Sequence, residues 1–232
     1  MKLTAKVKLI PDKEQFDFLK QTMIVCNKAC NFISEKAWNE KVFGQYNLQK
    51  LLYKTIKETF TLSAQIVIQS IIKVVDAYKL DKKNKRFFKP LGAITYDSRI
   101  LSWKTNKQFV SIWTVDGRCK IPYVCGDRQK ELLKFQQGET DLVLINNKFY
   151  LHTTCNIENP KPEDFKDIIG VDRGIVNIAT LSTGDNFASH HLLSVRCRYR
   201  RIRKKLQKKG TRSAKRLLVK RRKKENRLAT HT

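Results

Sequence analysis

Asp172 is the residue of this sequence best placed to do chemistry. It follows the apolar run 168–171 and precedes Gly174, so we expect it at the end of a short strand. A carboxylate in such a place destabilises a protein core unless it is paired, hydrogen-bonded or bound to a metal ion. Two interpretations stay open: a turn aspartate held by hydrogen bonds, or a ligand for a divalent cation.

A second kind of chemistry, the binding of polyanions, is predicted by the charge of the chain. The 232 residues carry 48 Lys/Arg and 21 Asp/Glu, a formal net charge of +27. Residues 196–227 hold 18 Lys/Arg and one acid, Glu225, so this stretch contributes +17. Like charge at this density indicates phosphate partners. The residues predicted to contact nucleic acid here are Arg196, Arg200, Arg201, Arg203, Lys204, Lys205, Lys208, Arg216 and Arg221.

Aromatic side chains among basic residues are a third candidate, because bases stack on aromatic rings. Phe87 is the strongest of them, since it stands next to Phe88 and between Arg86 and Lys89. Phe87, Arg86 and Lys89 are therefore predicted to contact nucleic acid. The other aromatic residues of this region are predicted to be strand core: Trp103, Trp113 and Tyr123.

The spacing of cysteine and histidine residues does not predict a metal site. The six cysteines include no Cys-x-x-Cys pair, and free thiols in a reducing compartment are the favoured interpretation. A zinc site made from the pairs Cys26/Cys30 and Cys119/Cys125 is the alternative. His190–His191 are expected on an exposed loop and are assigned no role.

The elements that must position these residues begin with a strand over residues 2–10, where apolar side chains alternate with lysines. Lys6 and Lys8 lie on its polar face and are further candidates for contact with a nucleic-acid backbone. Pro11–Asp12 predict the start of an amphipathic helix that runs to about Asn39. Two further helices are expected, at about 47–59 and from 61–63 to about 79.

Residues 92–155 consist of short alternating runs separated by turn residues, which predicts a small antiparallel barrel that the first strand joins. Asn146–Asn147 indicate a hairpin within it, and Gly126–Asp127 a turn. The strand that precedes the Asn146–Asn147 hairpin is expected to begin at Asp141. Pro160 and Pro162 predict a linker.

Three short strands are expected after the linker, followed by two helices that begin near Leu193 and break at Gly210, with Lys/Arg on all faces. The predicted fold class is therefore α+β in several parts. The parts are a first barrel strand (1–10), a helical segment (11–81), the antiparallel barrel (82–160) and strands with basic helices (161–232).

The segment 169–184, IGVDRGIVNIATLSTG, resembles the first RuvC motif of the TnpB (OrfB) family, which insertion sequences encode and which is related to type V CRISPR effectors. Residues 62–69 and 76–79 resemble the third N-terminal helix of that family. The order strand, helices, barrel and RuvC start resembles its wedge, recognition and nuclease parts. The resemblance implies a ribonuclease-H-like domain after residue 161, Asp172 as a catalytic Mg²⁺ ligand, and guide RNA and DNA as partners.

Other parts of the family pattern are not found in these 232 residues. The family has a later Glu, a final Asp and a zinc ribbon, and none of them matches a segment here; Glu225 is interpreted as a charge-paired surface residue. One carboxylate cannot hold two Mg²⁺ ions in catalytic geometry. We therefore expect a truncated TnpB/OrfB-type, transposase-associated protein that binds nucleic acid without independent cleavage.

Two alternatives stay open: an inactive family member acting as an RNA-guided DNA-binding regulator, or an unrelated basic RNA-binding structural protein. No apolar run reaches the length of a membrane span, and the first ten residues are typical of a strand rather than a signal peptide. A cytoplasmic location in a bacterium or archaeon, without a membrane partner, is expected. The sequence predicts no oligomeric state.

Overall fold

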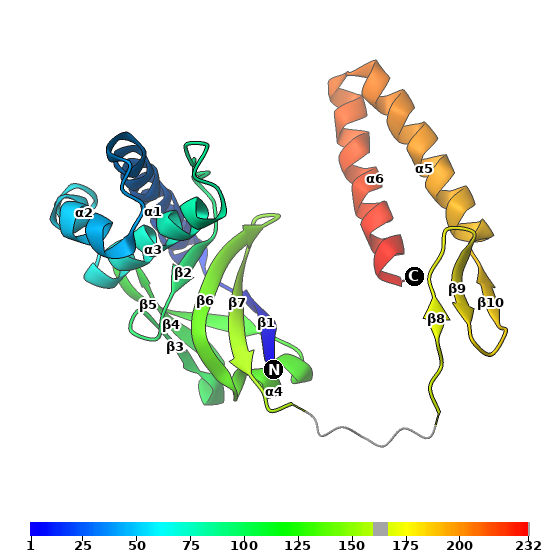
Figure 1. The fold of residues 1–232 in the computed structure, drawn as a ribbon, viewed down its shortest axis with the longest axis horizontal. Helices are drawn as coiled ribbons and strands as arrows, with labels where there is room; N and C mark the ends of the chain where they lie inside the picture. Colours follow the sequence, from blue (N-terminus) through cyan, green and yellow to red (C-terminus); the bar gives the residue numbers. More distant parts are fainter. Residues whose placement is uncertain (160–166, 232) are drawn as a thin grey trace. The chain divides into compact units, whose positions relative to one another are not determined.

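The structure is a computed structural model that describes residues 1–159 and 167–231. The chain divides into two compact units, Met1–Pro160 and Lys161–Thr232, and each is described by itself. The protein is α+β, with N-terminal helices, a seven-stranded near-closed antiparallel barrel, a small sheet and two C-terminal helices (Figure 1). The linker expected at Pro160 and Pro162 lies outside the described residues.

The first unit is built on the barrel, whose strand order is β2-β6-β7-β1-β5-β4-β3. The strands are β1 (Lys2–Leu9), β2 (Ile94–Tyr96), β3 (Leu101–Lys104), β4 (Phe109–Thr114), β5 (Gly117–Val124), β6 (Gln136–Ile145) and β7 (Lys148–Asn156). The expectation that the first strand joins the barrel is confirmed, because β1 pairs with both β5 and β7. Asn146 and Asn147 have φ of 50° and 59°, as a two-residue hairpin turn requires.

Three helices follow β1, as predicted: α1 (Lys13–Glu40), α2 (Gln45–Phe60) and α3 (Ala64–Leu80). The start of α1 is fixed by the Asp12 carboxylate, which accepts a hydrogen bond from the Gln15 amide at 2.8 Å. Its buried apolar residues recur every three or four positions: Leu19, Met23, Cys26, Cys30, Ile33 and Ala37. They share one core with the inner face of the barrel, where the Phe16 and Phe149 ring centroids are 4.9 Å apart.

Two expectations for the first unit are wrong in detail. Gly126–Asp127 lead into a short helix, α4 (Asp127–Leu133), instead of a simple turn. β6 begins at Gln136, ahead of the expected Asp141. The pairing of β6 with β7 shifts register between Gln136 and Thr140, where Gly138 has φ 96°. This bulge interrupts the alternation of side chains and so hides the first half of the strand in the sequence.

The second unit holds a three-stranded antiparallel sheet in the order β10-β9-β8, followed by two helices. The elements are β8 (Val171–Asp172), β9 (Asn177–Leu181), β10 (Asn186–Ala188), α5 (His190–Lys209) and α6 (Arg212–His231). The strand expected over 168–171 is shorter than predicted. His190–His191 form the first turn of α5, so the expected loop is wrong there. Gly210 has φ 62°, a left-handed conformation that glycine adopts readily, and it ends α5 as predicted.

Burial differs sharply between the units. In the first, side chains such as Leu19, Ile33 and Phe149 are completely buried. Among the described residues of the second, only Ser189 and Ala214 are buried. Within the part of the chain that the structure describes, no helix combines the length and the apolar character needed to span a bilayer.

Candidate nucleic-acid interface

Helices α5 and α6 form a hairpin that packs along one seam. The less exposed residues recur every three or four positions: Val195, Tyr199, Ile202 and Leu206 on α5, and Ala214, Leu218, Arg221, Glu225 and Leu228 on α6. This spacing places each set on one side of its helix. The expectation that Lys/Arg occupy all faces is therefore wrong for the seam, which holds one of the predicted basic residues, Arg221, and is otherwise mostly apolar.

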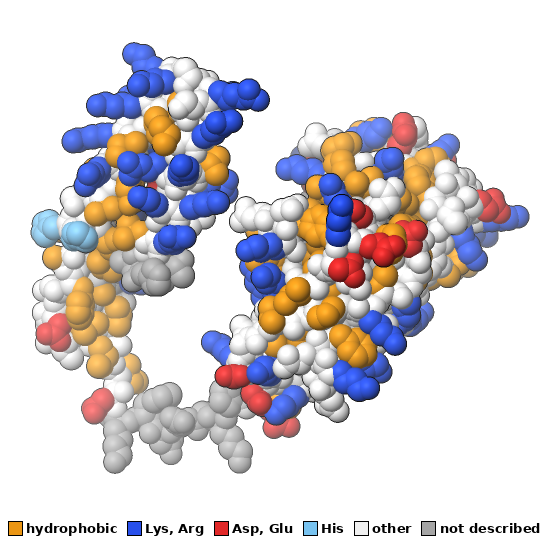
Figure 2. All heavy atoms as spheres, turned by 180° about the vertical axis from the view of Figure 1, so that it is seen from behind, with side chains coloured by type: hydrophobic (Ala, Val, Ile, Leu, Met, Phe, Trp, Pro, Cys, Tyr) orange, Lys and Arg blue, Asp and Glu red, His pale blue; other side chains and the backbone are white. Residues whose placement is uncertain are grey.

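The remaining predicted basic residues of the hairpin face solvent: Arg196, Arg200, Arg201, Arg203, Lys204, Lys205, Lys208 and Arg216. Figure 2 shows Lys and Arg side chains projecting along its length. Among the described residues of the hairpin, one ion pair is formed, between Arg203 and Glu225 at 3.6 Å. The charge pairing predicted for Glu225 is confirmed, although the partner is on the facing helix rather than on its own. No other cation among the described residues of the hairpin has an acidic partner.

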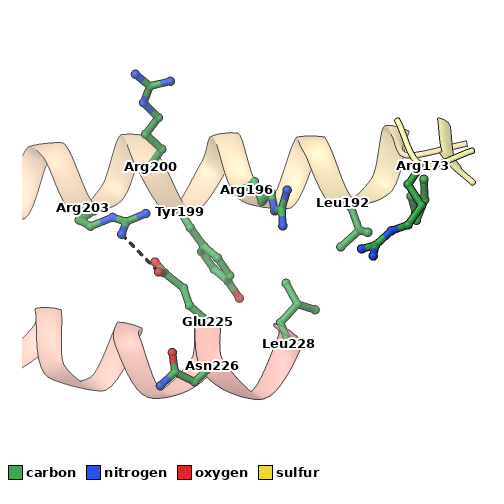
Figure 3. A pocket seen from close by; sticks show the side chains of 10 residues that line it. Arg173, Leu192, Arg196, Tyr199, Arg200, Arg203, Glu225, Asn226 and Leu228 are labelled. Carbon is green, nitrogen blue, oxygen red and sulfur yellow. Dashed lines mark ion pairs between the residues drawn. The ribbon is translucent and has the colours of Figure 1, made fainter. Parts of the chain in front are cut away.

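A groove of about 680 Å³ lies between the two helices and the sheet of the second unit. Figure 3 shows Tyr199 and Leu192 pointing from α5 toward α6, with Leu228 pointing back across the space. Arg173, the residue after β8, reaches into the same space, whereas Arg200 points away from α6. The groove therefore combines an aromatic ring and apolar side chains with guanidinium groups.

Asp172 lies on an exposed two-residue strand, and its backbone pairs with Thr180. Because the Asp172 carboxylate is exposed to solvent, it does not require a hydrogen bond, an ion pair or a metal ion to be stable there. In the described residues, no three or more His, Cys, Asp or Glu side chains gather so as to hold a metal ion. That finding covers the Mg²⁺ site expected at Asp172 and the alternative zinc site of the cysteine pairs. The residues present do not fit either metal, and the role of Asp172 stays a prediction.

Lys6 and Lys8 lie on the outer face of the barrel, Lys6 exposed and Lys8 half-buried. In the pairing of β1 with β7, Lys6 is opposite His152 and Lys8 is opposite Tyr150. The Lys6 ammonium lies 4.5 Å from the centroid of the Tyr150 ring. Nε2 of His152 is buried without a hydrogen-bond partner among the described residues. Two rings that were not predicted from the sequence, Tyr150 and His152, therefore lie beside the two predicted lysines.

Phe87 is held out into solvent by a tightly bonded loop between α3 and β2. Its side chain is 77% exposed, whereas Phe88 packs against the core. The Asn31 side chain fixes the backbone of Phe88, donating to its carbonyl at 2.9 Å and accepting from its amide at 2.7 Å. The Arg86 guanidinium is directed inward, to the Asp81 carboxylate at 2.7 Å, while Lys89 is exposed. Arg86 therefore closes the loop, and contact of these residues with nucleic acid stays a prediction.

The structure brings some predicted residues together and leaves others apart. The hairpin gathers the basic residues of 196–227, whereas Lys6, on β1, and Phe87, on the loop between α3 and β2, belong to the first unit. The expectation of strand core is confirmed for Tyr123, which is buried, and Trp103 and Trp113 are partly buried and pack against the same core.

Sequence reasoning missed Arg173 and Tyr199 as partners in the groove. The position of Tyr199 in the three-and-four spacing of α5 was the available signal for one of them. The position of Arg173 depends on how β8 meets the hairpin, which no local pattern reveals.

No protein-family model matches this sequence. No curated protein matches it either. Among solved structures, the chain is similar to a chain of the cryo-EM structure of the Cas12f1–sgRNA–target DNA complex, with 12% identity and a TM-score of 0.38. The similarity covers 97% of this chain and 66% of that chain, so the protein spans less than two thirds of the length of its structural neighbour. Similarity at this level does not establish membership of a family.

Proposed function

We propose that this protein binds nucleic acid and that the hairpin α5–α6 is its main contact surface. One observation carries the proposal: the solvent-facing Lys and Arg residues of the hairpin have a single acidic partner, Glu225, among the described residues. Phosphates supply the missing negative charge, and binding them releases condensed counterions, which favours association. Contact of this kind recognises the backbone rather than the bases.

The first unit adds smaller surfaces to this proposal. Lys6, Lys8 and the Tyr150 ring form a patch on the barrel that combines ammonium groups with an aromatic face. Phe87 offers a second exposed ring, on a loop that is already ordered and therefore loses little entropy on binding. Both features suit single-stranded segments, whose bases are available for stacking.

Salt dependence of binding to labelled DNA and RNA tests the main proposal. The logarithm of the binding constant is expected to fall linearly with the logarithm of salt concentration, with a slope of about −0.7 per contacted phosphate for single strands. A triple variant, Arg201→Gln, Lys204→Gln and Lys205→Gln, removes three exposed cations of the hairpin. It is expected to flatten the slope by about two.

The matched control is Lys50→Gln, Lys54→Gln and Lys57→Gln, three exposed cations on α2. It removes the same charge from the other unit and is expected to leave the slope nearly unchanged. Equal flattening by both triple variants would mean that the net charge of the chain, rather than the hairpin, drives binding. Binding that does not respond to salt would contradict the proposal as a whole.

At a finer level, we propose a relationship to the TnpB/OrfB family, with guide RNA and DNA as partners. The support is the resemblance of residues 169–184 to the first RuvC motif. Sequencing of the RNA that co-purifies with the protein from its native host tests this proposal. One small RNA from a transposon end is the expected result. Ribosomal RNA would overturn it in favour of an unrelated RNA-binding role.

We also propose that these residues bind without cutting. Asp172 is exposed, and no other carboxylate, thiol or imidazole group completes a metal site with it among the described residues. Two-metal cleavage requires several ligands in fixed geometry. Incubation of the purified protein with Mg²⁺ and bound nucleic acid is expected to yield no cleavage. Cleavage that Asp172→Ala abolishes would show the proposal to be wrong.

A further inference from the structure

The groove of the hairpin has a property that phosphate-backbone binding does not use. Near the turn at Gly210 the seam is closed, and Ala214 is buried there. Farther along, the seam opens into the groove of about 680 Å³ described above. That volume lies within the range of about 300–1,000 Å³ that is common for pockets that bind small molecules.

The walls of the groove are of two chemical kinds. Tyr199, Leu192 and Leu228 present an aromatic ring and aliphatic side chains to the space between the helices (Figure 3). Arg173 and Arg196 bring guanidinium groups to its opening from two different elements. A ligand that combines a flat apolar ring system with a negative charge would complement both the apolar side chains and the guanidinium groups.

The charge of the groove is not balanced from within the unit. Glu225 is its one carboxylate, and it lies 3.6 Å from the Arg203 guanidinium. Arg173 and Arg196 have no carboxylate partner among the described residues. An inorganic anion would satisfy these guanidinium groups but leave the Tyr199 ring uncovered, and an apolar molecule would do the reverse.

We propose that the groove takes one unstacked nucleotide of a single strand. The base stacks against Tyr199, between Leu192 and Leu228, and the adjoining phosphate binds Arg173 and Arg196. This inference rests on the proposed function and adds a position at which a base leaves its stack. A base within a duplex is paired and stacked on its neighbours, so the groove distinguishes single strands from duplexes.

Photo-crosslinking of the full chain tests the position of the base. Short single strands of DNA and RNA that carry 5-iodouracil are bound and irradiated, and the crosslinked peptide is identified by mass spectrometry. The expected crosslink is at Tyr199. Tyr199→Phe is expected to keep it, and Tyr199→Leu to lose it together with about tenfold in affinity, because a stacked base is lost.

A matched pair of arginines tests the phosphate contact. Arg196 lines the groove, whereas Arg198, two positions along α5, is exposed, lies on the opposite side of the helix and does not line the groove. Arg196→Ala and Arg198→Ala remove the same charge from the same helix. We expect Arg196→Ala to weaken single-strand binding roughly tenfold more, because it removes a charge-assisted hydrogen bond inside the groove. Circular dichroism checks that both variants keep the helicity of the wild type.

The outcomes separate this inference from the function on which it rests. If the wild-type protein binds no strand at any salt concentration, the proposed function is overturned. If it binds, but both arginine variants lose the same affinity and Tyr199→Leu loses none, the outer charges of the hairpin suffice and the groove inference alone is overturned. A duplex that crosslinks to Tyr199 as efficiently as a single strand would also overturn the unstacked base.

Discussion

The two units of this protein use their apolar residues in opposite ways. In the first, the inner face of the barrel and three helices enclose side chains such as Ile33 and Phe149, which are completely buried. In the second, Ile168 is 88% exposed, Ile175 81% and Val176 68%. Burial of apolar surface is the main driving force of folding, so the first unit has its own source of stability and the second has little. The first unit therefore has a buried core of its own, whereas the second leaves much of its apolar surface exposed.

The largest expected difference between the units is in thiol protection. Cys197 is exposed on α5, whereas Cys26 and Cys30 are buried on α1. Burial raises the pKa of both α1 thiols, so almost no reactive thiolate forms in the folded state. Alkylation followed by peptide mapping is expected to label Cys197 at once. Cys26 and Cys30 are expected to be labelled slower by several orders of magnitude, because they require the core to open.

Cys155, buried on β7, is the control for the barrel and is expected to be protected with the α1 thiols. Rapid labelling of Cys26 in the native protein would show that the first unit lacks the stable core on which the comparison depends.

Core truncation is expected to have the next largest effect. Phe149→Ala removes a completely buried ring of β7 and is expected to destabilise the protein by about 3–5 kcal/mol. Phe187→Ala on β10 removes the same ring from a side chain that is 55% exposed, with an expected change below about 0.5 kcal/mol. Urea unfolding followed by circular dichroism measures both. Similar losses for the two variants would mean that the second unit has a core after all.

A smaller difference is expected between two lysines of α3. The Lys73 ammonium donates to Asn27 Oδ1 at 2.7 Å and to the Ala93 carbonyl at 2.6 Å, and burial lowers the pKa of Lys73. Lys73→Met leaves these acceptors without a donor and is expected to cost about 1–3 kcal/mol of stability.

Lys79→Met is the control for Lys73→Met. The Lys79 side chain is 69% exposed, and its ion pair with Asp76 lies at the surface. Its loss is expected to change the free energy of unfolding by less than about 1 kcal/mol. If both lysine variants are neutral, the buried network around Asn27 does not contribute to the stability of the first unit.

The smallest expected effect concerns Glu225 in the hairpin. Glu225→Gln removes the acidic partner of Arg203, whose side chain is 51% exposed, so the change in stability is expected to be below about 1 kcal/mol. Affinity for nucleic acid is expected to rise slightly, because Arg203 becomes free to bind phosphate. Fluorescence anisotropy at fixed salt measures this rise. A loss of affinity would show that Glu225 positions Arg203 for binding rather than competing for it.

Local patterns predicted the helices and turns of the first unit, but not the register between its strands. The helix over α1 follows from the capping residue Asp12 and from apolar residues at spacings of three and four, both of which are local signals. The Asn146–Asn147 turn was found for the same reason. The bulge at Gly138 and the opposition of Lys8 to Tyr150 were not found, because they depend on register between strands distant in the sequence.

For the candidate interface, the sequence predicted where the charge lies but not how the side chains are arranged in space. Composition located the basic stretch correctly, since charge density can be read without a fold. The seam and its groove could not be read in this way, because a run of arginines hides which of them points inward. Arg196 and Arg200 are one turn apart on α5 and both line the groove, yet the Arg200 side chain points away from α6 (Figure 3).

The pairing of β1 with β7 has a consequence for the order of events during folding. Lys2 lies opposite Asn156, and Leu3 opposite Cys155, so the first strand of the chain closes against one of the last strands of its unit. Contacts of such long sequence separation form slowly, because a large loop must close first. On the ribosome, α1 to α3 can form while the barrel is still incomplete. The first strand must wait, unpaired on this side, until β7 has left the exit tunnel.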